Sequence, residues 1–132
     1  MIGKGVSNMS SVIAYRAPMG AGKSSFAASM PGRSFWFDLE RGAHRARGFD
    51  PDKHEIWSIA PDINLMTFAK GDRVAGQKEN WLSIVTKLVE VCQRSDIDNI
   101  IFDTAKVAWT TCHKGFLQEL QDDDLEKAQA KG

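Results

Sequence analysis

Four short stretches of the chain are rich in apolar, β-branched or aromatic residues and are bounded by turn-forming residues. They cover residues 11–15, 34–39, 54–59 and 99–103, with the third the weakest of the four. Runs of this length between turn signals are typical of buried strands. The second and fourth runs are almost continuously apolar, as in strands that are covered on both faces. The pattern predicts a mainly parallel sheet.

Helical patterns separate these runs. Apolar residues recur at helical spacing near the middle of the chain, at Trp81, Leu82, Val85, Leu88, Val89 and Cys92. Residues 24–30 also suit a helix, ended by Pro31-Gly32, and residues 116–131 suit another. The alternation of strands and helices predicts an α/β fold. We expect one domain over residues 1–132, with residues 1–10 as a loose lead-in and 122–132 as a charged tail.

The segment between the first run and the first helix is rich in small residues. It reads Ala17-Pro18-Met19-Gly20-Ala21-Gly22-Lys23-Ser24-Ser25, which fits the phosphate-binding (Walker A) pattern G-x-x-x-x-G-K-[ST] with Ala17 as its first residue. Small residues let backbone N–H groups converge on a polyphosphate. Lys23 would contact the β- and γ-phosphates of ATP, and the Ser24 hydroxyl would bind Mg²⁺. A strand before and a helix after favour a nucleotide site at Pro18–Ser25 over a chance glycine-rich turn.

The fourth apolar run ends in an acid, Ile100-Ile101-Phe102-Asp103. This is the form of a Walker B strand, whose terminal carboxylate orients the water shell of the Mg²⁺ bound by Ser24. The alternative is that Asp103 caps the following turn together with Thr104. The presence of the phosphate loop upstream favours the first interpretation.

Glu40 follows the second apolar run. In open α/β sheets, ligands bind beyond the carboxyl ends of the strands, so Glu40 could face the γ-phosphate and polarise a water molecule. The alternative is a surface acid paired with Arg41 or Arg45, a pairing that contributes little.

The composition is that of an ordinary globular protein. Of 132 residues, 42% are hydrophobic, and 17 basic residues balance 17 acidic ones. With zero net charge, any nucleic acid would have to be bound by a local patch. Cys92 and Cys112 are too few for a disulfide framework or a zinc site, and reduced thiols are expected.

The sequence shows no membrane or targeting signal. No apolar run has the length needed to cross a bilayer, and Met1–Gly5 lacks the apolar core of a signal peptide. We therefore expect a cytoplasmic protein without membrane contact.

Several motifs together carry a family resemblance. They are the phosphate loop, Pro31-Gly32-Arg33-Ser34, Phe37-Asp38-Leu39-Glu40-Arg41-Gly42 and Ile100-Ile101-Phe102-Asp103-Thr104. From Val12 to about Leu120 the chain resembles the RecA-like P-loop ATPases, and more narrowly the nucleotide-binding AAA-type proteins of phages and prophages, some related to single-strand annealing recombinases. The resemblance implies a three-layer α/β/α fold, ATP and Mg²⁺ as ligands, and Glu40 as the catalytic glutamate beside Lys23.

One departure from the RecA-like pattern concerns the end of the chain. In the sheet of RecA-like domains, a further strand lies between the phosphate-loop strand and the Walker B strand. In the sequence, this further strand comes after the Walker B strand. After Asp103 the chain offers Lys106–Cys112 and then a helix, with no further β-prone apolar run. We therefore expect the sheet to lack its last strands and the chain to be the N-terminal part of a longer protein.

Three further features allow a functional and a plain interpretation. The basic segment with Arg41, His44, Arg45 and Arg47 could contact single-stranded DNA, although such runs are more often solvated loops. Trp109 could stack on a base, but a core or interface tryptophan is more common. Cys112 and His113, although adjacent, do not form a metal site.

These observations predict an ATP-binding protein that in complete form is an ATPase of phage-type DNA recombination or replication. Single-stranded DNA and further copies of the chain are its expected partners. A nucleotide or small-molecule kinase is one alternative, but residues 62–80 offer no clear arginine-bearing lid. A non-catalytic nucleotide-binding or assembly module is the other.

The expected gap in the sheet leads to a stability prediction. If a strand is missing between residues 12–15 and 100–103, facing rows of backbone groups stay unpaired, at about 1–3 kcal/mol for each buried group, against about 5–15 kcal/mol of total stability. The 132-residue chain should melt at low temperature or aggregate, and the downstream segment should stabilise it. A reversible thermal transition of the monomer above about 60 °C would contradict this.

Overall fold

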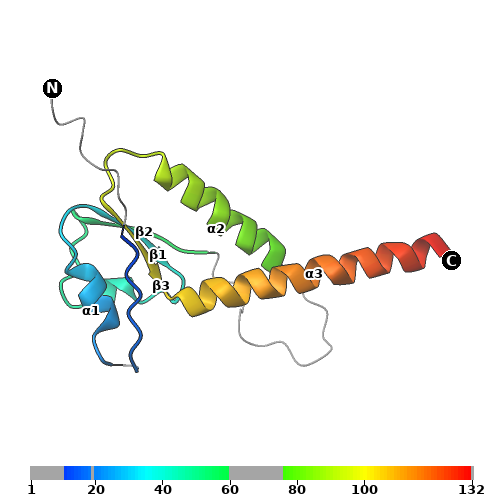
Figure 1. Cartoon of the computed structure of the whole chain (residues 1–132), viewed down its shortest axis with the longest axis horizontal. Helices are drawn as coiled ribbons and strands as arrows, with labels where there is room; N and C mark the ends of the chain where they lie inside the picture. Colours follow the sequence, from blue (N-terminus) through cyan, green and yellow to red (C-terminus); the bar gives the residue numbers. More distant parts are fainter. Residues whose placement is uncertain (1–10, 19, 60–75, 132) are drawn as a thin grey trace.

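The computed structural model describes residues 11–18, 20–59 and 76–131 of the chain (Figure 1). In chain order its elements are α1 (Lys23–Ala28), β1 (Ser34–Asp38), the 3-10 helix η2 (Ala43–Arg45), β2 (His54–Trp57), α2 (Gln77–Cys92), β3 (Asn99–Asp103) and α3 (Ala105–Lys131). Three of the four predicted strands are therefore confirmed, close to the predicted bounds.

The three strands form a parallel sheet in the order β2-β1-β3. Ser34 lies opposite His54 on one side and Asn99 on the other, so all three strands begin at the same level. At the carboxyl end Asp38 lies opposite Asp103. β1 is buried along its whole length, which explains its run of three aromatic residues, since a central strand between two helical layers meets no water on either face.

Alternate residues of β1 point into two separate hydrophobic clusters. One cluster joins the sheet to α2 and α3 and contains Phe35, Phe37, Ile84, Val91 and Val107. The other joins it to α1 and η2 and contains Trp36, Ile101, Ala28 and Ala43. The period-2 alternation of a strand places helices on both faces of the sheet, and the predicted three-layer α/β/α fold is confirmed.

An ion-pair cluster lies at the amino end of the strands. The Arg94 guanidinium donates to both carboxylate oxygens of Glu55 at 3.0 and 2.8 Å and to Asp96 at 2.7 Å. These bonds hold the pKa of Glu55 and the pKa of Asp96 below their ordinary values. The cluster ties the turn after α2 to β2, at the opposite end of the strands from Glu40.

The strand predicted at residues 11–15 is not formed. Residues 11–18 have no regular secondary structure, and the side chains of Val12, Ile13 and Tyr15 are 96%, 59% and 49% exposed. A strand requires a neighbour for its backbone hydrogen bonds. Among the described residues β3 pairs only with β1, so no neighbouring strand is there to hold this run. The apolar composition of residues 11–15 does not indicate whether a neighbouring strand is present.

The buried face of α2 also differs from the predicted one. Leu82, Val89 and Cys92 were predicted to share the apolar stripe, but all three are exposed. The buried residues are Gln77, Asn80, Ile84 and Val91, with Trp81 and Leu88 partly buried beside them. Both sets have helical spacing, and the packing against the sheet and α3 selects between them. Residues 65–69, whose sequence suits a helical turn, lie outside the described residues.

α3 packs against the first turn of α2 through a polar and a small residue. The Gln118 side-chain oxygen accepts hydrogen bonds from the backbone N–H groups of Gln77 and Lys78, both at 3.0 Å. Gln118 thereby satisfies two N–H groups that a helix start leaves without an intrahelical partner. Gly115 lies one turn earlier, where an added Cβ would come within 3.1 Å of the Lys78 Cα and 3.3 Å of the Gln77 oxygen.

We predict that Gly115→Ala destabilises the protein although alanine favours helices by about 1 kcal/mol. The extra methyl group meets backbone atoms, which cannot move aside as a flexible side chain would, so we expect a net loss of about 1–3 kcal/mol. Urea unfolding followed by circular dichroism measures the change. Ser83→Ala on the exposed face of α2 is the control, and equal stability of the two variants would contradict the close packing.

Candidate functional site

The phosphate loop leads directly into α1. The Ala21 N–H donates to the Pro18 carbonyl at 3.1 Å, which closes a turn before the helix begins at Lys23. Gly20 and Gly22 have φ of 82° and 86°, a region that residues with a side chain rarely adopt. An added Cβ at either position would meet nothing within 4 Å. The two glycines are therefore needed for backbone conformation. Met19 lies outside the described residues.

The loop is joined to the sheet by one long-range hydrogen bond between side chains. The Ser24 hydroxyl donates to the Asp103 carboxylate at 2.8 Å, across 79 positions of sequence. Ser24 lies in the first turn of α1, and Asp103 is the last residue of β3. Both side chains are only partly buried, so they remain accessible from the carboxyl edge of the sheet. The structure thus brings together the two residues that the sequence predicted as Mg²⁺ ligands.

Glu40 reaches the same edge from β1. The Leu39 N–H donates to the Asp103 carbonyl at 2.9 Å, which extends the pairing of β1 and β3 one residue beyond the strands. The next residue, Glu40, is exposed, and its carboxylate accepts a hydrogen bond from the Thr104 hydroxyl at 3.2 Å. This hydrogen bond pairs Glu40 with Thr104, and the predicted alternative of an ion pair with Arg41 or Arg45 is not what the structure shows. The peptide bond between Asp103 and Thr104 is cis.

Asp38 has a different role from its neighbour Glu40. Its side chain is buried and accepts hydrogen bonds from the backbone N–H groups of Gly42 at 2.9 Å and Ala43 at 3.0 Å. The carboxylate thus closes the turn that follows β1 and points back into the protein. Of the two acids near the carboxyl end of β1, only Glu40 projects from the protein.

The comparison with known families agrees with this geometry. A family model described as an AAA domain matches residues 10–132. The chain belongs to the AAA-domain family. No match to a curated protein or to a solved structure was found. The match covers nearly the whole chain, and it assigns this AAA domain to the nucleotide-binding P-loop ATPases in general.

Thr104 is the site residue that the sequence did not predict as functional. The sequence suggests Thr104 only as a partner of Asp103 in capping the turn after β3. In the structure its hydroxyl donates a hydrogen bond to the Glu40 carboxylate. The available signal was its position, the first residue after the acid that ends β3. That position lies beside β1 only because β3 pairs with β1, and sequence patterns do not specify which strands are neighbours.

The remaining candidates lie around the site or away from it. The side chains of His44, Arg45 and Arg47 are exposed, and the Arg47 N–H donates to the Ser25 hydroxyl at 3.2 Å, so the basic segment borders the phosphate loop. Arg41 instead donates to the Ile59 carbonyl. Trp109 lies on α3 and is 70% exposed, which rules out the core position considered for it.

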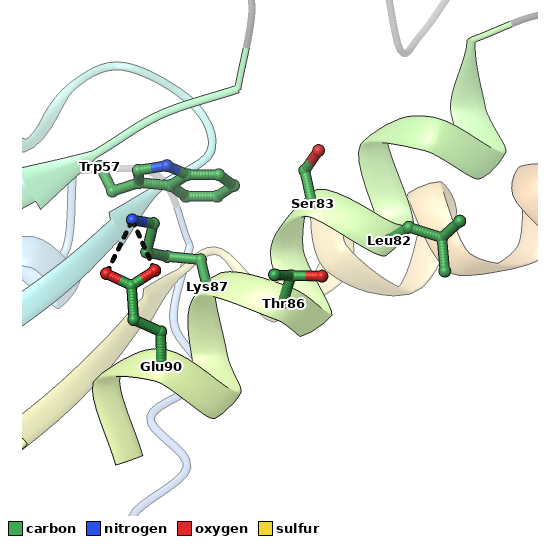
Figure 2. Close-up of a pocket in the computed structure, with 6 residues that line it drawn as sticks. All are labelled: Trp57, Leu82, Ser83, Thr86, Lys87 and Glu90. Atoms are coloured by element: carbon green, nitrogen blue, oxygen red, sulfur yellow. Dashed lines mark hydrogen bonds and ion pairs between the residues drawn. The ribbon is translucent and has the colours of Figure 1, made fainter. Parts of the chain in front are cut away.

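An open groove of about 410 Å³ lies between β2 and α2, on the sheet face opposite α1. It is lined by Trp57, Leu82, Ser83, Thr86, Lys87 and Glu90. In Figure 2 the Lys87 ammonium group lies on the side of α2 that faces Trp57, and it pairs with Glu90 at 3.1 Å. Because this pair is internally neutralised, the groove presents no net charge to a phosphate, and it is separate from the phosphate loop.

Residues 11–18, 20–59 and 76–131 hold no group of three or more His, Cys, Asp or Glu side chains arranged to bind a metal ion. No helix among them combines the length and the apolar character needed to cross a bilayer.

We predict that Asp38 acts on stability. Asp38→Ala leaves two N–H groups of the turn without acceptors, so the free energy of unfolding should fall by about 1–3 kcal/mol. Asp52→Ala, on the exposed turn before β2, should change it by less than about 0.5 kcal/mol. Chemical denaturation compares the two. If Asp38→Ala is as stable as Asp52→Ala but binds ATP more weakly, Asp38 belongs to the nucleotide site after all.

Proposed function

We propose that this AAA domain binds ATP with Mg²⁺ at the phosphate loop and that Glu40 promotes hydrolysis of the γ-phosphate. The observation that carries the proposal is the 2.8 Å hydrogen bond from Ser24 to Asp103. It joins a Walker A hydroxyl to a Walker B carboxylate, and these are the two oxygen donors that P-loop ATPases use around their metal ion.

The donor set fits Mg²⁺. This ion prefers oxygen ligands and is usually bound by one or two protein groups together with water and phosphate oxygens. Ser24 and Asp103 supply a hydroxyl and a carboxylate within hydrogen-bonding distance of each other, and no larger cluster of acids is required. Bound there, Mg²⁺ would neutralise charge on the phosphates. The roles assigned to this chain are that Ser24 and Asp103 hold the ion and that Pro18–Ser25 surround the phosphates.

Lys23 and Glu40 would act on the two sides of the reacting phosphate. Lys23 is the first residue of α1 and follows Gly22 directly, so its ammonium group can compensate the charge of the phosphates. Glu40 is exposed at the same edge of the sheet, with its carboxylate oriented by the Thr104 hydroxyl. A carboxylate fixed in this way can accept a proton from a water molecule, which is the role of a general base.

We further propose that the domain acts on DNA in recombination or replication of the phage type, with single-stranded DNA and other copies of the chain as partners. The support is the resemblance of the motifs around Glu40 to recombinase ATPases, together with the exposed basic residues His44, Arg45 and Arg47 next to the loop. Exposed arginines beside a nucleotide site are suited to contact a phosphodiester backbone.

A turnover assay separates this function from its alternatives. Release of labelled phosphate from ATP is measured with and without single-stranded DNA, and a phosphorylated product is sought among added nucleosides and nucleotides. Hydrolysis stimulated by DNA supports the proposal. Transfer of the label to an added acceptor indicates a kinase, and ATP binding without turnover indicates a non-catalytic module.

We predict that Lys23→Ala weakens ATP binding by at least about tenfold, because a charge-assisted contact of about 1.5–3 kcal/mol is lost. Isothermal titration calorimetry with MgATP measures the affinity. Lys53→Ala, in the turn before β2, removes a lysine at the other end of the strands and is the control. The same affinity for wild type and Lys23→Ala would refute the phosphate-loop assignment.

We predict that Glu40→Gln leaves the affinity for ATP nearly unchanged and lowers the turnover rate by about 10²–10⁴-fold, since glutamine keeps the shape but cannot act as a base. Glu90→Gln, which removes an exposed acid from α2, should change neither the affinity nor the turnover rate. Calorimetry gives the affinity for ATP, and phosphate release gives the turnover rate. Wild-type turnover in Glu40→Gln would show that Glu40 is only a surface acid.

A further inference from the structure

Arg41 has a backbone conformation that is unusual for its residue type. Its φ is 59°, in the left-handed region, where the Cβ of a residue other than glycine is crowded by the following carbonyl oxygen. Within the part of the chain that the structure describes, it is the one non-glycine residue with a positive φ. The next residue, Gly42, has a φ of −117° and does not use the freedom of a glycine. The turn after β1 therefore places an arginine where a glycine would be less strained, and surrounding contacts must hold it there.

Backbone hydrogen bonds show what this conformation does for the chain. The Arg41 N–H donates to the Asp38 carbonyl at 3.3 Å, which closes a four-residue turn with Glu40 as its third residue. The left-handed step that follows brings the N–H groups of Gly42 and Ala43 to the Asp38 carboxylate, at 2.9 and 3.0 Å. Glu40 therefore lies at the tip of a turn that ends in Arg41, and the direction of its side chain depends on that turn.

The Arg41 side chain ties this turn to the neighbouring strand. Its guanidinium group donates to the carbonyl of Ile59, two residues beyond the end of β2. The Ile59 side chain is buried in the hydrophobic core, so this carbonyl is a fixed anchor. A second bond joins the same two segments, because the Ser58 hydroxyl donates to the Asp38 carbonyl at 3.0 Å. The turn that carries Glu40 is thus attached to the end of β2.

We propose that Arg41 is a positioning residue for Glu40. The Thr104 hydroxyl holds the Glu40 carboxylate from the side of β3 at 3.2 Å, and Arg41 holds the Glu40 backbone from the side of β2. Together they give the carboxylate one direction at the carboxyl edge of the sheet. This inference rests on the proposed function of Glu40 as a general base, and it assigns Arg41 no contact with the nucleotide.

The contacts of Arg41 disfavour two other roles. A contact with the phosphates of ATP or of DNA would require the guanidinium group to leave the Ile59 carbonyl. A role in folding alone does not call for an arginine, since glycine at the same place would relieve the backbone strain. Arg41 is also exposed, so its replacement opens no cavity in the core, and the fold should tolerate the variants used below.

The first test separates turnover from stability and from binding. Arg41→Gly removes the tether and relieves the strain, so its urea midpoint and its affinity for MgATP should stay close to those of the wild type. Phosphate release without DNA should fall by about tenfold, because a small displacement of a catalytic group lowers the rate strongly. Arg41→Lys keeps a donor for the Ile59 carbonyl and should recover most of the rate. Lys53→Ala, the control at the other end of the strands, should match the wild type in all three measurements.

The second test asks whether Arg41 acts through Glu40. Arg41→Gly should not lower the residual rate of Glu40→Gln any further, since positioning has no effect once the positioned group cannot react. Amide hydrogen exchange gives a readout that is independent of hydrolysis. The N–H groups of Gly42 and Ala43 should exchange at least about fivefold faster in Arg41→Gly and near the wild-type rate in Arg41→Lys, with the Ile84 N–H of α2 as the unchanged reference.

The results distinguish this inference from the proposed function. Wild-type turnover in Arg41→Gly, weaker ATP binding, a further loss of rate in the double variant, or an Arg41→Lys variant no faster than Arg41→Gly overturns the inference and leaves the role of Glu40 intact. Unchanged exchange at Gly42 and Ala43 overturns it even where no hydrolysis is detected. Wild-type turnover in Glu40→Gln refutes the general base instead, and hydrogen exchange then decides by itself whether Arg41 fixes this turn.

Discussion

The parallel pairing of β1 with β3 is the constraint on which the rest of this AAA domain depends. The two strands are in register from Ser34 and Asn99 to Asp38 and Asp103, and the Leu39 N–H continues the pairing by donating to the Asp103 carbonyl. Since parallel strands end at the same edge, residues about sixty positions apart in sequence come to lie side by side there. Glu40 meets Thr104 for this reason alone. A slip of β3 by one residue would turn Phe102 to the wrong face of the sheet and would move Asp103 away from its place opposite Asp38.

The phosphate loop depends on the same edge but is held to it by side chains. Ser24 donates to Asp103, and the Ser25 hydroxyl accepts from the Arg47 backbone. No strand pairing supports the segment before the loop among the described residues, and Val12 and Tyr15 remain exposed. The site is therefore assembled from a firmly packed half, carried by β1 and β3, and a half that is attached through two hydroxyl groups and through the packing of Ala28 of α1 against the sheet. One of the groups that attach the loop, the Ser24 hydroxyl, is also suited to bind a metal ion.

α3 reverses the usual relation between burial and polarity in a helix. It packs against α2 with a glutamine that caps a helix start and a glycine that allows close approach, while Trp109, Phe116 and Leu120 remain exposed. The helix satisfies this inner contact through close approach and hydrogen bonding, and among the described residues Val107 is the large apolar side chain of α3 that is buried in the core.

The sequence by itself determined the local features of this protein. The aromatic run of β1, the apolar run of β3, the small residues of the phosphate loop and the acids after two strands all follow from short-range patterns, because strand and turn propensities are set by neighbouring residues. The three-layer fold and the pairing of Ser24 with Asp103 as candidate ligands could be inferred from those patterns. Only the tertiary structure decided the rest. Whether residues 11–15 form a strand depends on a neighbour that they cannot specify, and which face of α2 is buried depends on where the sheet and α3 lie. Asp38 and Glu40, two residues apart, differ in role because one carboxylate meets the backbone of the following turn and the other meets a hydroxyl from β3, and such contacts between distant segments leave no local signal in the chain.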